Sequence, residues 1–201
     1  MYSYQGQTGM SRLLVILITL LVTVPEFSDA QDHDYRRPDF NLPDLTGQER
    51  AISEWDGNAL LINFWATWCI PCKREIPMLN QLAEEYRGRD FQVLGIAVDN
   101  VDNIQEFMAT LPLEYVTLAH EDRSQEVASL FHDSFLVLPF TVFLDHQGRV
   151  FWMQVEEIHR EEVDAILGRI WQVKSGELQF EDAQLALIED LDRIMQSRMD
   201  E

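Results

Sequence analysis

The sequence predicts an α/β fold in which a central mixed β-sheet is flanked by helices. Two observations support this prediction. Apolar runs typical of buried strands alternate along the chain with stripes of helical period. The only two cysteines, Cys69 and Cys72, stand between one such run and the helical pattern that follows it. A strand that leads through Cys-x-x-Cys into a helix is typical of a redox site.

Composition and charge narrow the class of protein. The 201 residues, 46% of them apolar, suffice for one hydrophobic core. The formal net charge of −20 opposes binding to phosphate backbones and anionic lipid, so we expect no nucleic-acid partner. Two cysteines are too few for a disulfide framework or a structural zinc site. We therefore expect no metal and no cofactor.

Residues 1–30 resemble a secretory signal peptide. Arg12 precedes a largely apolar stretch at 13–24, and Ser28-Asp29-Ala30 is typical of a cleavage site. A bilayer crossing needs roughly 20 residues, so we expect cleavage, and an uncleaved N-terminal anchor is the alternative. Residues 31–36 would then be a flexible mature N-terminus. Export would place the cysteines in a compartment where disulfides persist.

Residues 37–174 are expected to form one domain that opens with a short hairpin, formed by 39–42 and 51–52. Ser53 is a candidate cap for a single helical turn that contains Trp55. Apolar runs predict strands at 59–65, 91–98, 115–118, 141–144 and 150–155. Apolar stripes predict helices at 71–86, from a cap at Asp102 to 110, at 124–131 and at 163–171. Pro77 predicts a kink within the first of these helices.

Residues 175–201 predict a further helix with an acidic outer face. Its apolar stripe comprises Leu187, Ile188, Leu191, Ile194 and Met195. Amphipathic helices most often bury such a stripe in their own chain, which favours a helix packed on the core. A helix that docks a partner is the alternative.

The cysteine pair suggests a division of labour between its two thiols. Cys69 is expected at a helix N-terminus, where unpaired N–H groups and the helix dipole favour a thiolate. Cys72, one turn further along, would attack the mixed disulfide that Cys69 forms with a substrate. An inert structural disulfide is the alternative, but a bond closing so short a loop contributes little stability.

Two further residues are candidates near the pair. Glu75 follows Cys72 by three residues, so its carboxylate is positioned to take the proton from the attacking Cys72 thiol. An exposed glutamate on the helix surface is the alternative interpretation of the same spacing. Pro139 precedes the strand at 141–144, where a proline is ordinary.

A resemblance to a known family sharpens these expectations. The segment 63–77, Asn-Phe-Trp-Ala-Thr-Trp-Cys-Ile-Pro-Cys-Lys-Arg-Glu-Ile-Pro, closely resembles the TlpA/ResA-like branch of the thioredoxin superfamily. The segment 138–148 is similar to that family's cis-proline strand and following turn. The likeness covers roughly 37–174 and includes a hairpin that plain thioredoxins lack. It implies a thioredoxin-like fold with an N-terminal β-hairpin extension.

The resemblance also implies a function. Members of the branch are periplasmic or membrane-tethered thiol–disulfide oxidoreductases, usually reductants, and often serve cytochrome c maturation. The implied partners are protein thiols and disulfides, apocytochrome c among them, and a membrane electron-donor protein. The implied site comprises the redox disulfide Cys69–Cys72, the acid–base residue Glu75, and the substrate-contacting residues Trp68, Ile70, Pro71, Leu138 and a cis Pro139 that faces Cys69.

The chain differs from plain thioredoxin at one position and departs from the family pattern at two places. Asn63 stands where plain thioredoxin has a buried aspartate, which makes Glu75 the better candidate for proton transfer. The segment 134–138 is bulky and apolar where glycines are common before the cis-proline. The glycine usual after the last strand is missing near Glu156 and Glu157. These departures leave the substrate open, cytochrome c maturation included.

Three other functions compete with disulfide exchange. A thioredoxin-fold copper chaperone would pair the cysteines with a distant histidine, and the candidates are His120, His132, His146 and His159. A separation of three residues between the cysteines would favour such a chaperone, whereas this chain has two. A redox adaptor would recruit a partner through the acidic helix at 175–201. A peroxidase would need a lone peroxidatic thiol in a different local pattern.

Overall fold

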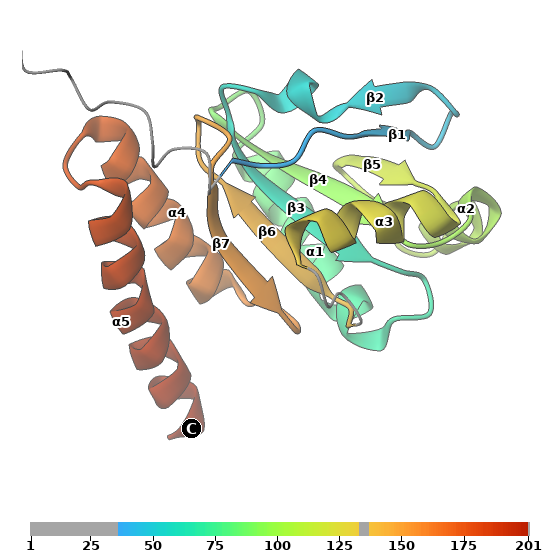
Figure 1. Ribbon diagram of the computed structural model, residues 1–201. Helices are drawn as coiled ribbons and strands as arrows, with labels where there is room; N and C mark the ends of the chain where they lie inside the picture. Colours follow the sequence, from blue (N-terminus) through green and yellow to red (C-terminus); the bar gives the residue numbers. More distant parts are fainter. Residues whose placement is uncertain (1–35, 133–136, 201) are drawn as a thin grey trace, which may run out of the picture. The chain divides into compact units, whose positions relative to one another are not determined.

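A computed structural model of the chain describes residues 36–132 and 137–200 (Figure 1). The expected signal peptide, and all of the expected flexible N-terminus except Arg36, lie outside the described residues. Within the described ranges, no helix is both long enough and apolar enough to cross a membrane.

Five strands form a mixed sheet in the order β5-β4-β3-β6-β7. Their bounds are Ala59–Trp65 for β3, Phe91–Ala97 for β4, Val116–Ala119 for β5, Phe140–Leu144 for β6 and Val150–Val155 for β7. The strands β3, β4 and β5 run parallel, whereas β6 is antiparallel to β3 and β7 antiparallel to β6. The mixed sheet predicted from the sequence is confirmed.

In the part of the chain that the structure describes, five α-helices accompany the sheet: α1 Ile70–Glu85, α2 Val101–Met108, α3 Glu121–Phe131, α4 Arg160–Ser175 and α5 Phe180–Met199. The expected cap of α2 was wrong. Asn100 caps this helix by accepting the N–H of Asn103 at 3.0 Å, while Asp102 lies in the first turn, where its charge suits the helix dipole. Helix α3 begins three residues before the expected Ser124, because the His120 ring caps it.

The predicted N-terminal hairpin is confirmed as β1 Asn41–Pro43 paired with β2 Glu49–Ala51. A 3-10 turn, η1 Ile52–Trp55, follows it. Ser53 does not cap this turn. It lies inside it, and Glu54 instead accepts the N–H of Ala51 at 2.9 Å.

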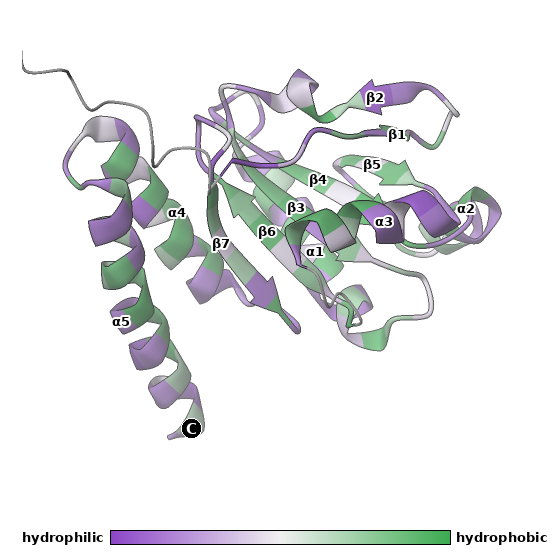
Figure 2. Cartoon of the chain, viewed as in Figure 1, coloured by the Kyte–Doolittle hydropathy of each residue, from purple (hydrophilic) through white to green (hydrophobic). Residues whose placement is uncertain are grey.

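The sheet has two faces with different coverings (Figures 1 and 2). On the hairpin face, Leu60, Ile62 and Phe64 of β3 pack in one cluster with the hairpin and α3. On the helix face, the alternate residues of β3 turn toward α1, and Leu61 clusters there with residues of α1, α4 and α5. Figure 2 shows the strands between these layers as largely hydrophobic.

Helix α5 packs against α4 and β7, as expected for a helix folded back on the core (Figure 1). Phe180, Ala183 and Leu187 are buried in the helix-face cluster. The buried stripe is rotated from the expected one, because Ile188 and Met195 are 45% and 56% exposed. The C-terminal helix is therefore part of the core on one side and presents apolar side chains on the other.

Candidate active site

Both cysteines lie at the N-terminus of α1. Cys69 occupies the N-cap position, and its Sγ accepts the backbone N–H of Cys72 at 3.2 Å. Pro71 fits the first turn, where a missing N–H removes no helical bond. The two sulfurs are joined in a disulfide. In the reduced form, this N–H and the helix dipole would both stabilise a Cys69 thiolate.

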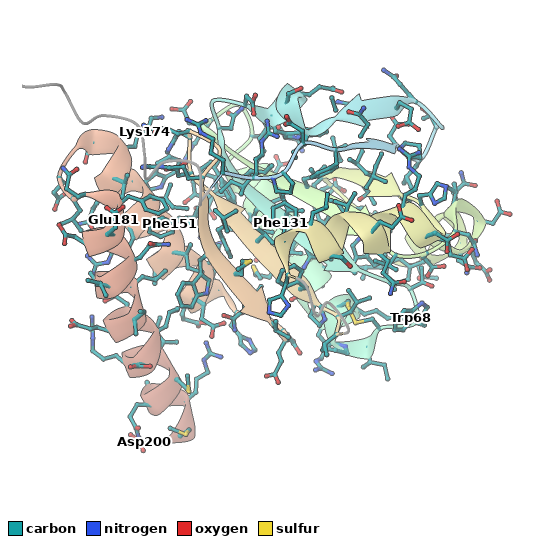
Figure 3. All side chains as sticks on the ribbon, viewed as in Figure 1. Trp68, Phe131, Phe151, Lys174, Glu181 and Asp200 are labelled. Carbon is teal, nitrogen blue, oxygen red and sulfur yellow. A yellow bond between two sulfur atoms is a disulfide. The ribbon has the colours of Figure 1, made fainter. Side chains whose placement is uncertain are left out.

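The two sulfur atoms differ in access. Cys69 is 5% exposed and Cys72 is fully buried, so a partner reaches Cys69 first. Trp68 and Ile70, on either side of Cys69, are 66% and 68% exposed. Figure 3 labels Trp68 beside the start of α1. Large apolar side chains held in water around a recessed sulfur are typical of a contact surface.

Asp99 fixes the loop that leads from β3 to Cys69. Its carboxylate accepts the backbone N–H and the hydroxyl of Thr67, at 3.1 and 2.5 Å, and the side-chain amide of Asn103 at 2.8 Å. Burial raises the pKa of Asp99, but the hydrogen bonds from Thr67 and Asn103 outweigh it, so the pKa lies below its ordinary value. The carboxylate therefore stays charged and holds the loop at neutral pH.

Pro139 lies at the same end of the sheet as the cysteines. The Leu138–Pro139 peptide bond is cis. The next residue, Phe140, pairs with Phe64 near the end of β3, so Pro139 stands where the chain leaves β3 toward Cys69. Leu138 packs against the cluster that contains both cysteines. Of the expected rim at 134–138, residues 134–136 lie outside the described residues.

Glu75 is buried on the helix face with only 2% of its surface exposed. Its Oε1 accepts the side-chain amide of Asn63 at 2.7 Å, and its Oε2 accepts the backbone N–H of Ile158 at 3.1 Å. Burial raises the pKa of Glu75 from 4.5 to about 7, although these two bonds oppose the rise and the charge of Glu157 adds to it. A carboxyl that titrates near neutrality can accept and return a proton.

Several polar groups on the helix face lack partners. Asn63 Nδ2 also donates to Thr141 Oγ1 at 3.1 Å. Among the residues that the structure describes, five buried side-chain atoms have no hydrogen-bond partner; one is His146 Nε2, and the four on this face are Asn63 Oδ1, Trp65 Nε1, Tyr115 Oη and Thr117 Oγ1. Burial, and then the charge of Glu75, raises the pKa of Tyr115, so this phenol stays protonated.

Gly95 makes room for this polar group of side chains. A Cβ at this position would lie 2.8 Å from Thr117 Oγ1 and 2.9 Å from the Tyr115 ring. Gly95 pairs with Asn63 on one side and with Thr117 on the other, so the three positions form one row across the sheet. A side chain larger than hydrogen would displace that row.

Within the described residues, the histidines that a copper chaperone would need do not gather at the cysteine pair. No group of three or more His, Cys, Asp or Glu side chains that could hold a metal ion occurs within 36–132 and 137–200. The candidate histidines are occupied elsewhere or lie on other elements. His120 caps α3, the His146 ring packs on Trp171, His132 follows α3 and His159 precedes α4.

Comparison with known proteins identifies the family. The model of the AhpC/TSA family matches residues 34–153. This chain belongs to the AhpC/TSA family. Over 134 residues it is 30% identical to the thiol-disulfide oxidoreductase ResA of Geobacillus kaustophilus, which covers 66% of this chain and 75% of ResA.

Two solved structures share the fold of this chain. A thiol-disulfide oxidoreductase from Bacteroides fragilis superposes with a TM-score of 0.57 at 26% identity, covering 67% of this chain and 98% of that one. A thioredoxin family protein described as a thiol:disulfide interchange protein, from Chlorobium tepidum, shares the fold with a TM-score of 0.60 at 24% identity, covering 67% and 94%. The chain is thus a TlpA/ResA-like thiol–disulfide oxidoreductase of the thioredoxin superfamily.

Sequence reasoning placed Cys69, Cys72 and Glu75 at the start of α1, and the structure has them there; their catalytic roles stay predictions. It interpreted Asn63 only as a replacement for an aspartate, although Asn63 bonds Glu75 directly. It missed Asp99 and the backbone of Ile158. Asp99 was detectable in principle, since it follows a buried strand parallel to β3, and the carboxyl ends of parallel strands meet at one edge. No local signal pointed to Ile158.

Proposed function

We propose that the protein is an exported oxidoreductase that reduces protein disulfides, working in the periplasm either free or tethered to the inner membrane. The signal-like segment at 1–30 supports export. The similarity to ResA proteins supports thiol chemistry. The unequal access of the two sulfurs supports a mechanism in which one thiol attacks and the other resolves.

In the reduced protein, the Cys69 thiolate attacks one sulfur of a substrate disulfide. A mixed disulfide forms, and the other substrate sulfur leaves as a thiolate. Cys72 then gives up its proton and attacks Cys69 Sγ. The Cys69–Cys72 disulfide forms, the second substrate thiolate leaves, and both substrate thiolates take up protons. Two electrons pass from the dithiol to the substrate.

Glu75 is the proposed acceptor of the Cys72 proton. It lies three residues beyond Cys72 on α1, in the same buried layer. A pKa near 7 lets it take a proton during attack and release it afterwards. Pro139 and Leu138 form the wall opposite, and the exposed Trp68 and Ile70 would contact an apolar stretch of the substrate.

The cycle requires an electron donor, because the Cys69–Cys72 disulfide must be reduced again after each turnover. A membrane electron-donor protein is the partner that the family resemblance suggests. Apocytochrome c is one protein substrate that the same resemblance suggests.

The residual exposure of Cys69, 5% against none for Cys72, carries the proposal, and it predicts different defects for the two thiols. Cys69→Ser should abolish insulin reduction, and full activity in that variant would disprove the mechanism. Cys72→Ser should instead accumulate a mixed disulfide that survives non-reducing electrophoresis. Equilibration with glutathione tests the direction of electron flow, since potentials in this fold span about −270 to −120 mV. A value at the oxidising end would make the protein an oxidant.

Copper titration of the reduced protein separates this proposal from a chaperone function. We expect no tight binding at one ion per protein, because no histidine joins the cysteine pair within the described residues. Stoichiometric binding that Cys69→Ser removes would favour the chaperone.

A redox adaptor is the second candidate, and one observation on α5 favours it. Its outward side chains Leu185, Ile188, Met195 and Met199 are 45% to 67% exposed and follow one another at spacings of three, seven and four residues, which place them on one side of the helix. The helix carries five acidic residues against two arginines, and both arginines are paired with acids. Because this surface of α5 is acidic, the partner that suits it is an amphipathic helix with basic residues on either side of its apolar stripe.

The adaptor candidate cannot be tested by removing 177–201, because Phe180 and Leu187 belong to the core. Ile188→Glu with Met195→Glu changes only the outer surface. Titration with a synthetic Leu/Lys amphipathic peptide, followed by NMR shifts of α5, should show binding to the parent and not to the variant. A scrambled peptide of equal charge is the control. Equal binding of both peptides would exclude the adaptor.

A further inference from the structure

The connection between β7 and α4 touches two parts of the active site with three consecutive residues. The backbone N–H of Glu156 donates to the carbonyl oxygen of Pro139 at 3.1 Å. The Glu157 carboxylate accepts Nε of Arg74 at 2.7 Å. The backbone N–H of Ile158 donates to Oε2 of Glu75 at 3.1 Å. We call residues 156–158 the brace.

The brace joins segments that are distant in the sequence. Arg74 and Glu75 belong to α1 and closely follow the cysteines, whereas Pro139 is the cis-proline immediately before β6. Arg74 is separated from Glu157 by 83 residues, and so is Glu75 from Ile158. One short connection therefore bonds both to α1, just after the disulfide, and to the segment that carries the cis-proline.

The backbone of the brace is in an unusual conformation. Glu156 has φ 81°, and it is the one non-glycine residue with positive φ in 36–132 and 137–200. Residues other than glycine rarely adopt a positive φ, and a protein retains such a residue where the surrounding contacts fix the backbone conformation. The contacts on either side of Glu156 provide that constraint.

The brace also brings charge to Glu75. The carboxylate of Glu157 adds to the rise in the pKa of Glu75 that burial causes. The other titratable group coupled to Glu75 is Tyr115, which stays protonated. Arg74 neutralises Glu157 from the solvent side, where its own side chain is 58% exposed.

We propose that Arg74 and Glu157 are positioning residues for disulfide exchange, which hold the brace so that the Ile158 N–H stays on the Glu75 carboxylate. This inference rests on the proposed role of Glu75 in the proposed function. The opposing interpretation is an ordinary surface ion pair, which contributes little in water. The two interpretations differ in what happens to the titration of Glu75.

Both substitutions are expected to raise the midpoint of the Glu75 titration. Glu157→Gln removes a nearby negative charge, which lowers the midpoint by about half a pH unit, but it also frees the brace and weakens the Ile158 hydrogen bond, which raises the midpoint by about one unit. Arg74→Gln leaves the charge unneutralised and frees the brace, so both effects raise the midpoint. An ordinary surface ion pair would instead give shifts of opposite sign in the two variants. Two measurements follow these shifts: the ¹³C titration of the Glu75 carboxyl in the oxidised protein, and the pH dependence of insulin reduction. Glu161→Gln, an exposed acid on the first turn of α4, is the control of equal charge and should move neither midpoint.

The Glu75→Gln background decides whether Arg74 and Glu157 act through Glu75. There the two substitutions should no longer move the pH–rate profile. Equal shifts in that background, or no ¹³C shift in the parent background, would overturn the proposal. Inactivity of the unaltered protein toward insulin would instead refute the proposed function. The ¹³C titration would still report on the brace in that case.

Discussion

Ile62 and Asn63 are neighbours in β3, both fully buried, yet they face opposite interiors. Ile62 enters the apolar cluster beneath the hairpin and α3. Asn63 enters a layer that contains the buried carboxyl of Glu75 and four polar atoms without partners among the described residues. Burying polar groups without partners costs free energy, so these atoms reduce the stability that the helix face contributes.

The contrast between the two faces separates what stabilises the fold from what the chemistry at Glu75 would need. A dry interior would serve stability equally well on both sides of the sheet. Within the described residues, these four polar atoms lie on the side of the sheet that carries α1. Such a cost is typical of sites where a group must change its protonation state. The hairpin face is an apolar cluster, whereas the helix face combines an apolar cluster with the buried polar groups around Glu75.

Substitution of Ile62 should have the largest effect on stability. Ile62→Ala removes packing from a fully buried position and should lower the free energy of unfolding by about 2–5 kcal/mol. Urea unfolding of the oxidised protein measures this loss, which should be the same at pH 5 and pH 8. Ile188→Ala, on the exposed side of α5, is the matched control and should change stability little. A pH-dependent loss at Ile62 would break the distinction between the faces.

Glu75→Gln should give the next largest effect, and one that depends on pH. The pKa of Glu75 is raised in the folded protein, from 4.5 to about 7, so the folded state binds the proton more tightly than the unfolded chain. Its contribution is complete below about pH 4.5 and is lost as pH rises through 7. Relative to the Gln variant, the parent should lose about 3 kcal/mol across this window.

The oxidised protein suits the measurement of Glu75, because disulfide-bonded cysteines do not titrate. Unfolding free energies of parent and variant are subtracted at each pH, so the histidines, which both share, cancel. A difference that stays constant from pH 4.5 to 8 would show that Glu75 keeps an ordinary pKa.

The sequence predicted the elements of both faces, but not what distinguishes them. The apolar run of β3 and the stripe of α1 are local patterns, and each predicts a buried element from its own residues. The contact of Glu75 with Asn63 spans 12 positions, and that with Ile158 spans 83. Neither contact follows from a repeating pattern in the neighbouring sequence. The role of Ile158 was further hidden because its backbone, and not its side chain, makes the bond.

Asn63→Ala should shift the titration of Glu75 upward by about one pH unit. The Asn63 amide donates a charge-assisted hydrogen bond to the ionised carboxylate, and such a bond contributes about 1.5–3 kcal/mol. Its loss disfavours the charged form, so the pKa should rise above 7. The ¹³C titration of Glu75 in the oxidised protein measures the shift. Thr141→Val, which removes the second acceptor of the same amide, should have a smaller effect.

Glu156→Gly should have the smallest effect and the opposite sign. The left-handed φ of Glu156 costs a non-glycine residue about 1–2 kcal/mol, and glycine escapes this cost. Glycine also loses about 0.5–1 kcal/mol more on folding, so a net gain of about 0.5–1 kcal/mol in unfolding free energy remains. Glycine keeps the N–H that bonds Pro139, so the gain should not vary between pH 5 and 8. A loss of stability, or a gain that follows the titration of Glu75, would mean that the Glu156 side chain itself supports the helix face.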